Sequence, residues 1–241
     1  MVCRRLHSVL RREYSDQSLY DDAELQTLFL AGKSFIRLGD GEINLLPGLR
    51  NVYQSFSESL RDGMRSLIRE YRAECPYVLG IPRSITRTNR ELAERNRLYI
   101  WMPFKVFFWW MFPKNVSYMD AHAFYYDRYF EQVFAPLMRD KKVIVVTNAT
   151  IVEKMRMNPR IPWKGVDYIE TPAEQALGAY DVIVREIAAK VVRKDQTVLL
   201  FGLGPLGKMM IKEYSEKGFQ SIDVGRGLEA MFTDESLESL I

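Results

Sequence analysis

The sequence of 241 residues contains only two cysteines and two histidines. Cys3 lies near the N-terminus and Cys75 precedes a proline, so they form neither a disulfide framework nor a metal-binding spacing. Two histidines are too few for a histidine-rich zinc site. Because free thiols are typical of a reducing compartment, we expect a cytoplasmic protein.

The sequence also lacks a long apolar run and a large excess of charge of one sign. Its longest apolar run covers residues 106–112, which is too short to cross a bilayer. The N-terminal arginines are interspersed with apolar residues such as Leu6 and Val9, so no signal-peptide core follows them. The net charge of +3 and the pI near 8.7 do not indicate a nucleic-acid partner. We therefore expect a soluble protein.

The arginines are concentrated in two regions. Such clusters either form a solvated surface or attract anionic lipid or a phosphate-bearing substrate. We assign residues 1–20 to a basic N-terminal segment and residues 21–241 to one α/β domain. The clustered arginines are Arg4, Arg5, Arg11 and Arg12 near the N-terminus, and Arg83, Arg87, Arg90, Arg95 and Arg97 in the middle.

Strand-like and helix-like segments alternate from residue 21 onward. This alternation predicts a Rossmann-like α/β fold, a single domain with a mainly parallel sheet flanked by helices. In such sheets ligands lie outside the carboxyl ends of the strands. The expected strands are 34–38, 77–81, 142–147, 166–169, 197–201 and 221–224. The expected helices are 21–31, 57–74, 127–138, 151–157, 172–192 and 205–217, with two more within 89–113, the second after Pro103.

Two acids follow the first expected strand. Asp40 and Glu42 alternate with Gly39 and Gly41, and Arg37 precedes them. Carboxylates this close can face one point, which suits a divalent cation or the hydroxyl groups of a sugar. The alternative is an ordinary Asp-Gly turn in which Glu42 begins a helix.

A glycine-rich loop follows the strand at 197–201. Gly202, Gly204 and Gly207 have the spacing of the dinucleotide-binding fingerprint, and Asp223 stands where a ribose-binding acid is expected. Backbone N–H groups of such a loop and of the helix after it can bind phosphates. The alternative is tight packing of helix on strand without a ligand.

Three further loops carry candidate residues. Asp223 could bind a metal or a hydroxyl or act as a base, and Arg226 could neutralise a leaving diphosphate, unless both belong to a salt-bridged loop. Thr147 and Asn148 could reach a phosphate or a base, unless they cap a helix. His122 is either a ligand-binding or a structural histidine.

The aromatic segment 104–112 is too apolar to lie fully exposed in a monomer. It is either part of the core, a contact between copies in a homo-oligomer, or a surface that meets a lipid-linked acceptor. The third reading implies peripheral contact with the inner face of the membrane.

These loops resemble those of the GT-D-type glycosyltransferases, a bacterial family. The order and spacing agree from about Ser34 to Phe232. The matching segments are Arg37-Leu38-Gly39-Asp40-Gly41-Glu42, His122-Ala123-Phe124 with Arg128-Tyr129, Leu203-Gly204-Pro205, and Asp223-Val224-Gly225-Arg226.

The resemblance implies transfer of a sugar from a UDP-sugar to a glycan, glycoprotein or lipid-linked acceptor, in surface-polysaccharide or glycoprotein glycan assembly. It also implies Mn²⁺ or Mg²⁺ held by Asp40 and Glu42. Arg226 replaces the family's histidine; since arginine has no free lone pair, it would supply charge to the diphosphate instead. The predicted catalytic residues are Asp40, Glu42, Asp223 and Arg226. The predicted donor-binding residues are Arg37, Gly39, His122, Arg128, Thr147, Asn148, Gly202, Gly204 and Pro205.

Two other functions remain open at this stage. The first is an NAD(P)-dependent oxidoreductase that uses Gly202, Gly204 and Gly207. Against it, the fingerprint lies in the penultimate strand–helix unit, whereas a dinucleotide fold begins with it. The second is a catalytically degenerate nucleotide-sugar-binding protein, suggested by Arg226.

Overall fold

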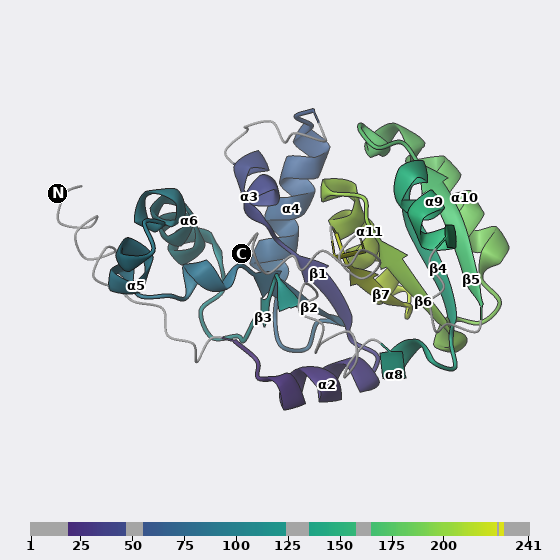
Figure 1. Ribbon diagram of the computed structural model, residues 1–241, viewed down its shortest axis with the longest axis horizontal. Helices are drawn as coiled ribbons and strands as arrows, with labels where there is room; N and C mark the ends of the chain where they lie inside the picture. Colours follow the sequence, from purple (N-terminus) through teal and green to yellow (C-terminus); the bar gives the residue numbers. More distant parts are fainter. Residues whose placement is uncertain (1–18, 47–54, 124–134, 158–164, 226, 229–241) are drawn as a thin grey trace.

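One parallel sheet organises the chain. The computed structural model describes residues 19–46, 55–123, 135–157, 165–225 and 227–228 (Figure 1). Within them, seven strands pair in the order β3-β2-β1-β7-β6-β4-β5, and every neighbouring pair is parallel. The predicted Rossmann-like α/β fold is confirmed. The strands are β1 (Ser34–Arg37), β2 (Tyr77–Ile81), β3 (Met119–Asp120), β4 (Lys142–Asn148), β5 (Val166–Thr171), β6 (Thr197–Phe201) and β7 (Gln220–Asp223).

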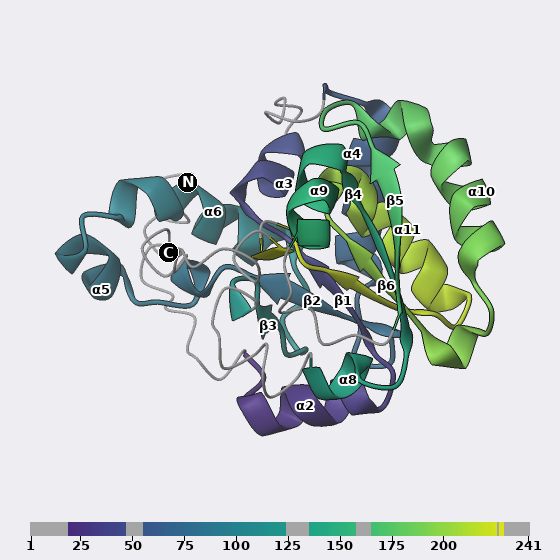
Figure 2. The ribbon, with the colours of Figure 1, turned by 45° about the vertical axis from the view of Figure 1, so that its right-hand side comes forward.

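Helices cover both faces of this sheet. In Figure 2, α9 lies in front of the strands, whereas α4 and α11 lie behind them. The described α-helices are α2 (Asp22–Leu30), α3 (Asp40–Leu45), α4 (Glu58–Glu70), α5 (Asn89–Glu94), α6 (Leu98–Met111), α8 (Ala135–Met138), α9 (Ala149–Met157), α10 (Tyr180–Lys190) and α11 (Pro205–Glu216). Short 3₁₀ turns are η2 (Arg83–Ile85), η5 (Ala176–Ala179) and η6 (Lys194–Gln196). None of these described helices is long and apolar enough to span a bilayer.

Two apolar cores lie on the two faces of the sheet. One joins α4, α10 and α11 through side chains such as Met64, Ile187 and Met210. The other joins α2, α8 and α9 through side chains such as Phe29 and Met155. Strands β4 and β6 are covered on both sides, which explains their unbroken apolar sequences.

The direction in which the chain crosses the sheet reverses between β4 and β6. From β4 the chain passes through α9 to β5, whereas from β6 it passes through α11 to β7 on the other side. Ligands of such folds bind outside the carboxyl ends of the strands at a reversal of this kind. The region between the starts of α9 and α11 is therefore the place where the topology favours a ligand.

Two parts of the predicted secondary structure needed correction, and one strand was missed. The helix expected over 172–192 begins only at Tyr180, because Gln175 is left-handed (φ 54°) and its side-chain amide binds Ser55. The two helices expected around Pro103 differ too, since α6 runs through this proline. Pro103 lies on the exposed side of α6, where water can solvate the carbonyl it leaves unbonded. Strand β3 was missed because two residues are too few for any periodicity.

The aromatic segment 104–112 divides between core and surface. Phe108 and Phe112 are buried against Tyr118, as the core reading predicts. Trp110 is 72% exposed, so the other two readings still apply to the outer side of α6. Residues 1–18 and 127–134, which include most of the basic segment and part of one expected helix, lie outside the described residues.

Candidate active site

A buried lysine lies between two buried carboxylates at the carboxyl edge of the sheet. The Nζ atom of Lys208 is 2.8 Å from Oδ2 of Asp223 and 3.2 Å from Oε1 of Glu42. The exposed fractions are 1% for Lys208 and Asp223 and 6% for Glu42. This ion-paired group of Glu42, Lys208 and Asp223 is the buried triad of the site, and it ties α3, α11 and β7 together.

Local structure explains the position of Glu42. Gly39 caps α3 with extended backbone, and its N–H donates to Oε2 of Glu42 over 2.9 Å. Since Oε1 faces Lys208, both carboxylate oxygens are engaged. The reading in which Glu42 begins a helix is thus correct, and the same residue also belongs to the site. Asp40 is the first residue of α3; its side chain lies outside what the structure describes.

The charges of the triad support one another. Burial disfavours the charged form of Glu42, but Lys208, Arg37 and the Gly39 amide outweigh it and hold the pKa of Glu42 below its usual range. Burial likewise disfavours the ammonium of Lys208, yet Asp223 and Glu42 raise the pKa of Lys208 above its ordinary value. Both groups are therefore charged at neutral pH.

The lowered pKa of Glu42 predicts a loss of stability in acid. A carboxylate with a lower pKa in the folded state stabilises the fold above its unfolded pKa, near 4.5, and this contribution disappears as the pH falls through the folded pKa. We expect the difference in unfolding free energy between wild type and Glu42→Gln to shrink below pH 4.5. Urea unfolding of both proteins from neutral to acidic pH measures it. A difference in unfolding free energy that does not change with pH would contradict a lowered pKa of Glu42 in the folded protein.

Arg37 and Gly225 complete the surroundings of Asp223. The backbone N–H of Arg37 donates to Oδ2 of Asp223 over 3.2 Å. Gly225 has φ 47°, and a Cβ atom there would lie 2.5 Å from the Arg37 guanidinium. Glycine at this position therefore lets the guanidinium lie against the backbone after β7.

The glycine-rich loop lies at the topological reversal. A Cβ atom on Gly202 would lie 2.8 Å from Oγ1 of Thr147, so β4 and β6 approach closely here. Thr147 donates to the Gly202 carbonyl over 3.3 Å, and Asn148 accepts from the Ile151 N–H over 3.1 Å as the cap of α9. Asn148 thus has the capping role weighed as its alternative, whereas Thr147 instead bonds the loop after β6; both residues lie at the carboxyl end of β4.

The start of α11 has the backbone of an anion-binding helix terminus. Gly204 caps the helix with φ 56° and ψ −140°, a conformation that only glycine adopts readily, and Pro205 is the first helical residue. Four residues into this helix, Lys208 points back to the triad. Helix α11 therefore begins at the glycine-rich loop and contributes Lys208 to the triad.

A second polar group lies at the same edge, two strands from β1. Asp120 ends β3, with Oδ2 3.5 Å from Nε of Arg83. Its Oδ1 accepts the backbone N–H of His122 over 2.9 Å and lies 3.7 Å from the His122 ring. His122 therefore lies at the carboxyl ends of the strands, but not beside the triad. Arg128 and Arg226 lie outside the described residues.

Comparison with known proteins decides the family. A sequence profile described as "Glycosyltransferase GT-D fold" matches residues 35–229. The chain belongs to this family. The predicted resemblance is confirmed, and membership makes the chain a glycosyltransferase.

Solved structures agree with the GT-D assignment. Two structures of the domain of unknown function 1792, one described as having a distinct glycosyltransferase fold, superpose with a TM-score of 0.76 at 19% and 18% identity. Each match covers 96% of this chain and 84% of the other. A new glycosyltransferase of the same domain from Streptococcus sanguinis superposes with a TM-score of 0.73 at 18% identity, over 89% and 83%. No curated protein matches the chain in sequence.

The described residues of this GT-D chain do not by themselves form the predicted metal site. Among them no three histidine, cysteine or acidic side chains are grouped for a metal ion. Glu42 faces the ammonium of Lys208 at 3.2 Å, and a dication on the same oxygen would repel that ammonium. The Mn²⁺ or Mg²⁺ site at Asp40 and Glu42 therefore stays a prediction, and in this arrangement Glu42 does not fit it.

The triad also bears on the oxidoreductase alternative. Asp223 would have to bind ribose hydroxyl groups, but it is buried and engaged by Lys208 and Arg37. Gly207 has a packing role, since a Cβ atom there would lie 3.3 Å from Leu203. The fingerprint spacing is thus explained without a dinucleotide.

The prediction from sequence assigned no site role to Lys208 and did not foresee the pairing of Arg83 with Asp120. A signal for Lys208 was present, because it lies one turn before Ile211 on the apolar side of α11. A lysine on the buried side of a helix needs a carboxylate partner. No comparable signal exists for Arg83 and Asp120, which meet only because β2 and β3 pair.

Proposed function

We propose that this glycosyltransferase moves a hexose from a UDP-sugar to a hydroxyl group of a glycan, glycoprotein or lipid-linked acceptor. Surface-polysaccharide or glycoprotein glycan assembly in the cytoplasm is the proposed setting. The observation that supports the proposal most is the triad, because Lys208 connects the Asp40-Gly41-Glu42 turn to the helix that follows the glycine-rich loop.

The donor diphosphate fits the start of α11. The positive end of the helix dipole favours an anion, and Gly204 keeps the approach free of a side chain. Pro205 has no N–H and the Gly207 N–H donates to the Gly204 carbonyl, so Leu206 offers the first-turn N–H proposed to meet the anion. Lys208 is not free to serve this anion, since two carboxylates already balance its charge. Backbone groups of α11, together with Arg226, are the proposed partners of the diphosphate.

The sugar fits the turn at the start of α3. Asp40 is proposed to accept hydrogen bonds from its hydroxyl groups, while Glu42 holds the turn in place through Gly39 and Lys208. The bond from the sugar to the diphosphate breaks as the acceptor oxygen attacks. Groups already oriented toward the leaving diphosphate stabilise its developing charge without rearrangement.

The general base proposed earlier, Asp223, receives little support from the geometry. It is 1% exposed and pairs with Lys208 over 2.8 Å, so a proton from the acceptor would have to displace this ion pair. Its position suits support of the lysine. Asp120 and His122 lie at the same ends of the strands, and their partners are more accessible, with the Arg83 side chain 46% exposed and the His122 side chain 20% exposed. They are the better place to seek an acceptor contact.

A thermal-shift screen tests the donor class. We expect UDP to raise the melting temperature by about 5 °C at saturation, and NAD and NADP to leave it unchanged. GDP and CMP test whether the protein distinguishes uracil from other nucleobases. Mn²⁺, compared with a chelator, tests whether nucleotide binding requires a metal ion. Gly204→Ala should reduce the UDP shift, because alanine strains the loop that receives the phosphates.

Each outcome of this screen decides one point. A UDP shift that requires Mn²⁺ supports the predicted cation, whereas a shift that survives the chelator assigns charge compensation to the protein. A shift with NAD or NADP alone would reverse the proposal in favour of the oxidoreductase.

A further inference from the structure

Helix α6 presents an apolar stripe to the outside of the molecule. Tyr99, Pro103, Val106 and Trp110 follow one another at three or four residues, so they share one side of the helix. Tyr99 is 93% exposed and Trp110 is 72% exposed. These four residues are called the α6 stripe below.

The opposite side of α6 packs against the rest of the domain. Phe108 packs in the core, and Lys105 is buried with Nζ bonded to the Asn89 side chain over 2.9 Å. The α6 stripe is therefore not the side that attaches the helix to the domain. A helix that is apolar outside as well as inside indicates a surface that meets another apolar phase.

Positive charge surrounds the α6 stripe. Residues 83–116 include five arginines and two lysines against two glutamates. Arg90, Arg95 and Arg97 are exposed just before the helix, and Lys114 is exposed just after it. Exposed aromatic side chains flanked by arginine and lysine are the composition that binds at the interface of an anionic bilayer.

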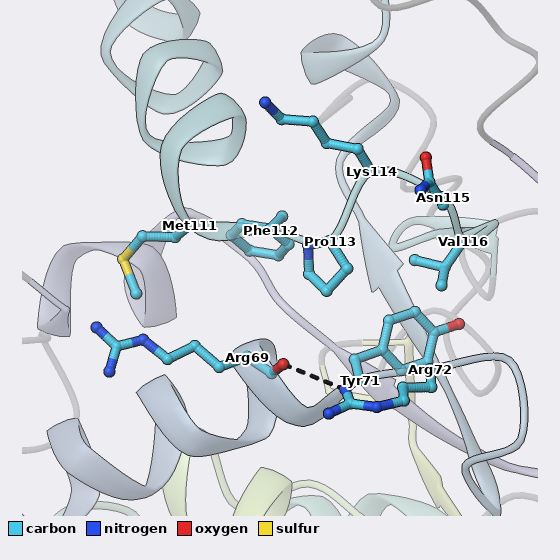
Figure 3. A pocket seen from close by; sticks show the side chains of 9 residues that line it. All are labelled: Arg69, Tyr71, Arg72, Met111, Phe112, Pro113, Lys114, Asn115 and Val116. Atoms are coloured by element: carbon cyan, nitrogen blue, oxygen red, sulfur yellow. Dashed lines mark hydrogen bonds between the residues drawn. The ribbon is translucent and has the colours of Figure 1, made fainter.

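A basic pocket adjoins the C-terminal end of the α6 stripe (Figure 3). Met111, which follows Trp110, is among its lining residues, and its volume is about 410 Å³. Arg69, Arg72 and Lys114 are its charged residues, and none of the described residues that line it is acidic. In the close-up, Arg72 is held by the Arg69 carbonyl over 3.4 Å.

The geometry points to an anionic bilayer as the occupant of this surface. We propose that the α6 stripe enters the interface of a membrane that contains anionic lipid, while Arg69, Arg72 and Lys114 contact the phosphates of several such lipids. The apolar α6 stripe suits the acyl chains of such lipids, and the three cations suit their phosphate groups. A free phosphate would leave the α6 stripe in water, and an apolar protein partner would leave the three cations without counter-charge.

The position of the surface leaves the donor site accessible. Helices α5 and α6 project from the β3 end of the sheet, away from β4 and β5 (Figure 1). The pocket lies where the chain enters β2 and β3, at the edge opposite to the triad. Docking therefore goes beyond the proposed transfer reaction and does not depend on it.

Vesicle sedimentation tests the proposal on the full chain. The vesicles contain phosphatidylcholine alone or phosphatidylcholine with phosphatidylglycerol, at low and high salt. We expect binding only to the mixed vesicles, weakened by salt, and reduced about tenfold by Tyr99→Ser with Trp110→Ser or by Arg69→Gln with Lys114→Gln. Val192→Ser and Arg185→Gln, exposed positions around α10, are matched controls that should bind as wild type.

Three outcomes would overturn the proposal. They are equal binding to both vesicle types, unchanged binding of the two double variants, and a dimer in solution that Tyr99→Ser with Trp110→Ser disperses while no vesicles bind. The substituted side chains are exposed, so melting temperatures should stay at the wild-type value and a folding defect can be recognised. Binding of UDP by the same variants, whatever its result, reports separately on the donor site.

Discussion

Replacement of Lys208 by methionine is expected to lower the free energy of unfolding by about 3–5 kcal/mol, because two buried carboxylates lose their shared counter-charge. Methionine matches the apolar stem of lysine as far as Cε, so the loss of the ammonium dominates. Asp223 is 1% exposed, and neither it nor Glu42 can recover this loss from water. Urea denaturation at neutral pH measures the difference.

Lysine 212 offers a matched control on the same helix. Lys212 pairs with Glu70 at 3.4 Å and Glu216 at 3.0 Å, but these carboxylates are about half exposed. Lys212→Met should therefore cost less than about 1 kcal/mol. In a Lys208→Met protein, Asp223→Asn should restore part of the lost stability, because it removes one of the two uncompensated charges.

Equal costs for the two lysine substitutions would contradict the description of the triad. Failure of Asp223→Asn to restore any stability would mean that Lys208 acts through packing alone. If Lys208→Met does not fold, recovery of folding in the double variant still supports the pairing, since it carries one fewer buried charge.

Conversion of Asp40 to asparagine should reduce kcat/KM by about a hundredfold or more, with little change in stability. The substitution keeps the shape of the side chain and removes its charge at the first residue of α3. Release of UDP from the UDP-sugar, with and without acceptor, measures the effect. Asp22→Asn, at the first residue of α2, is the control and should leave the rate unchanged.

The role of Glu42 makes the choice of variant important. Asp40→Ala with Glu42→Ala should abolish transfer, but it should also destabilise the fold, since Glu42 holds Lys208 and the Gly39 N–H. The single Asp40 variant avoids this ambiguity. Full turnover by a folded Asp40→Asn protein would remove Asp40 from the site.

The sequence determined the fold class and the edge at which the site lies. Strands β4 and β6 have unbroken apolar sequences, and a chain of this alternation can bury them only in a parallel sheet with helices on both faces. The turn at Asp40 and the loop at Gly202 follow strands directly. Their place at the carboxyl edge followed from connectivity alone.

Only the tertiary structure decided how these loops act together. The same Asp-Gly-Glu spacing suits a metal ligand or a helix start. Gly39 caps a helix that includes both acids, and the ion pair between Glu42 and Lys208, 166 positions away in the chain, is a further role that neither reading predicts. By its place in the sequence Asp223 matches an acid that binds the ribose of a dinucleotide. In the structure β7 pairs with β1, and Asp223 instead contacts Arg37 and Lys208. Local sequence sets strands, turns and caps because neighbours in the chain make them, whereas the partner of a buried charge depends on which strands pair and which helices pack across the sheet.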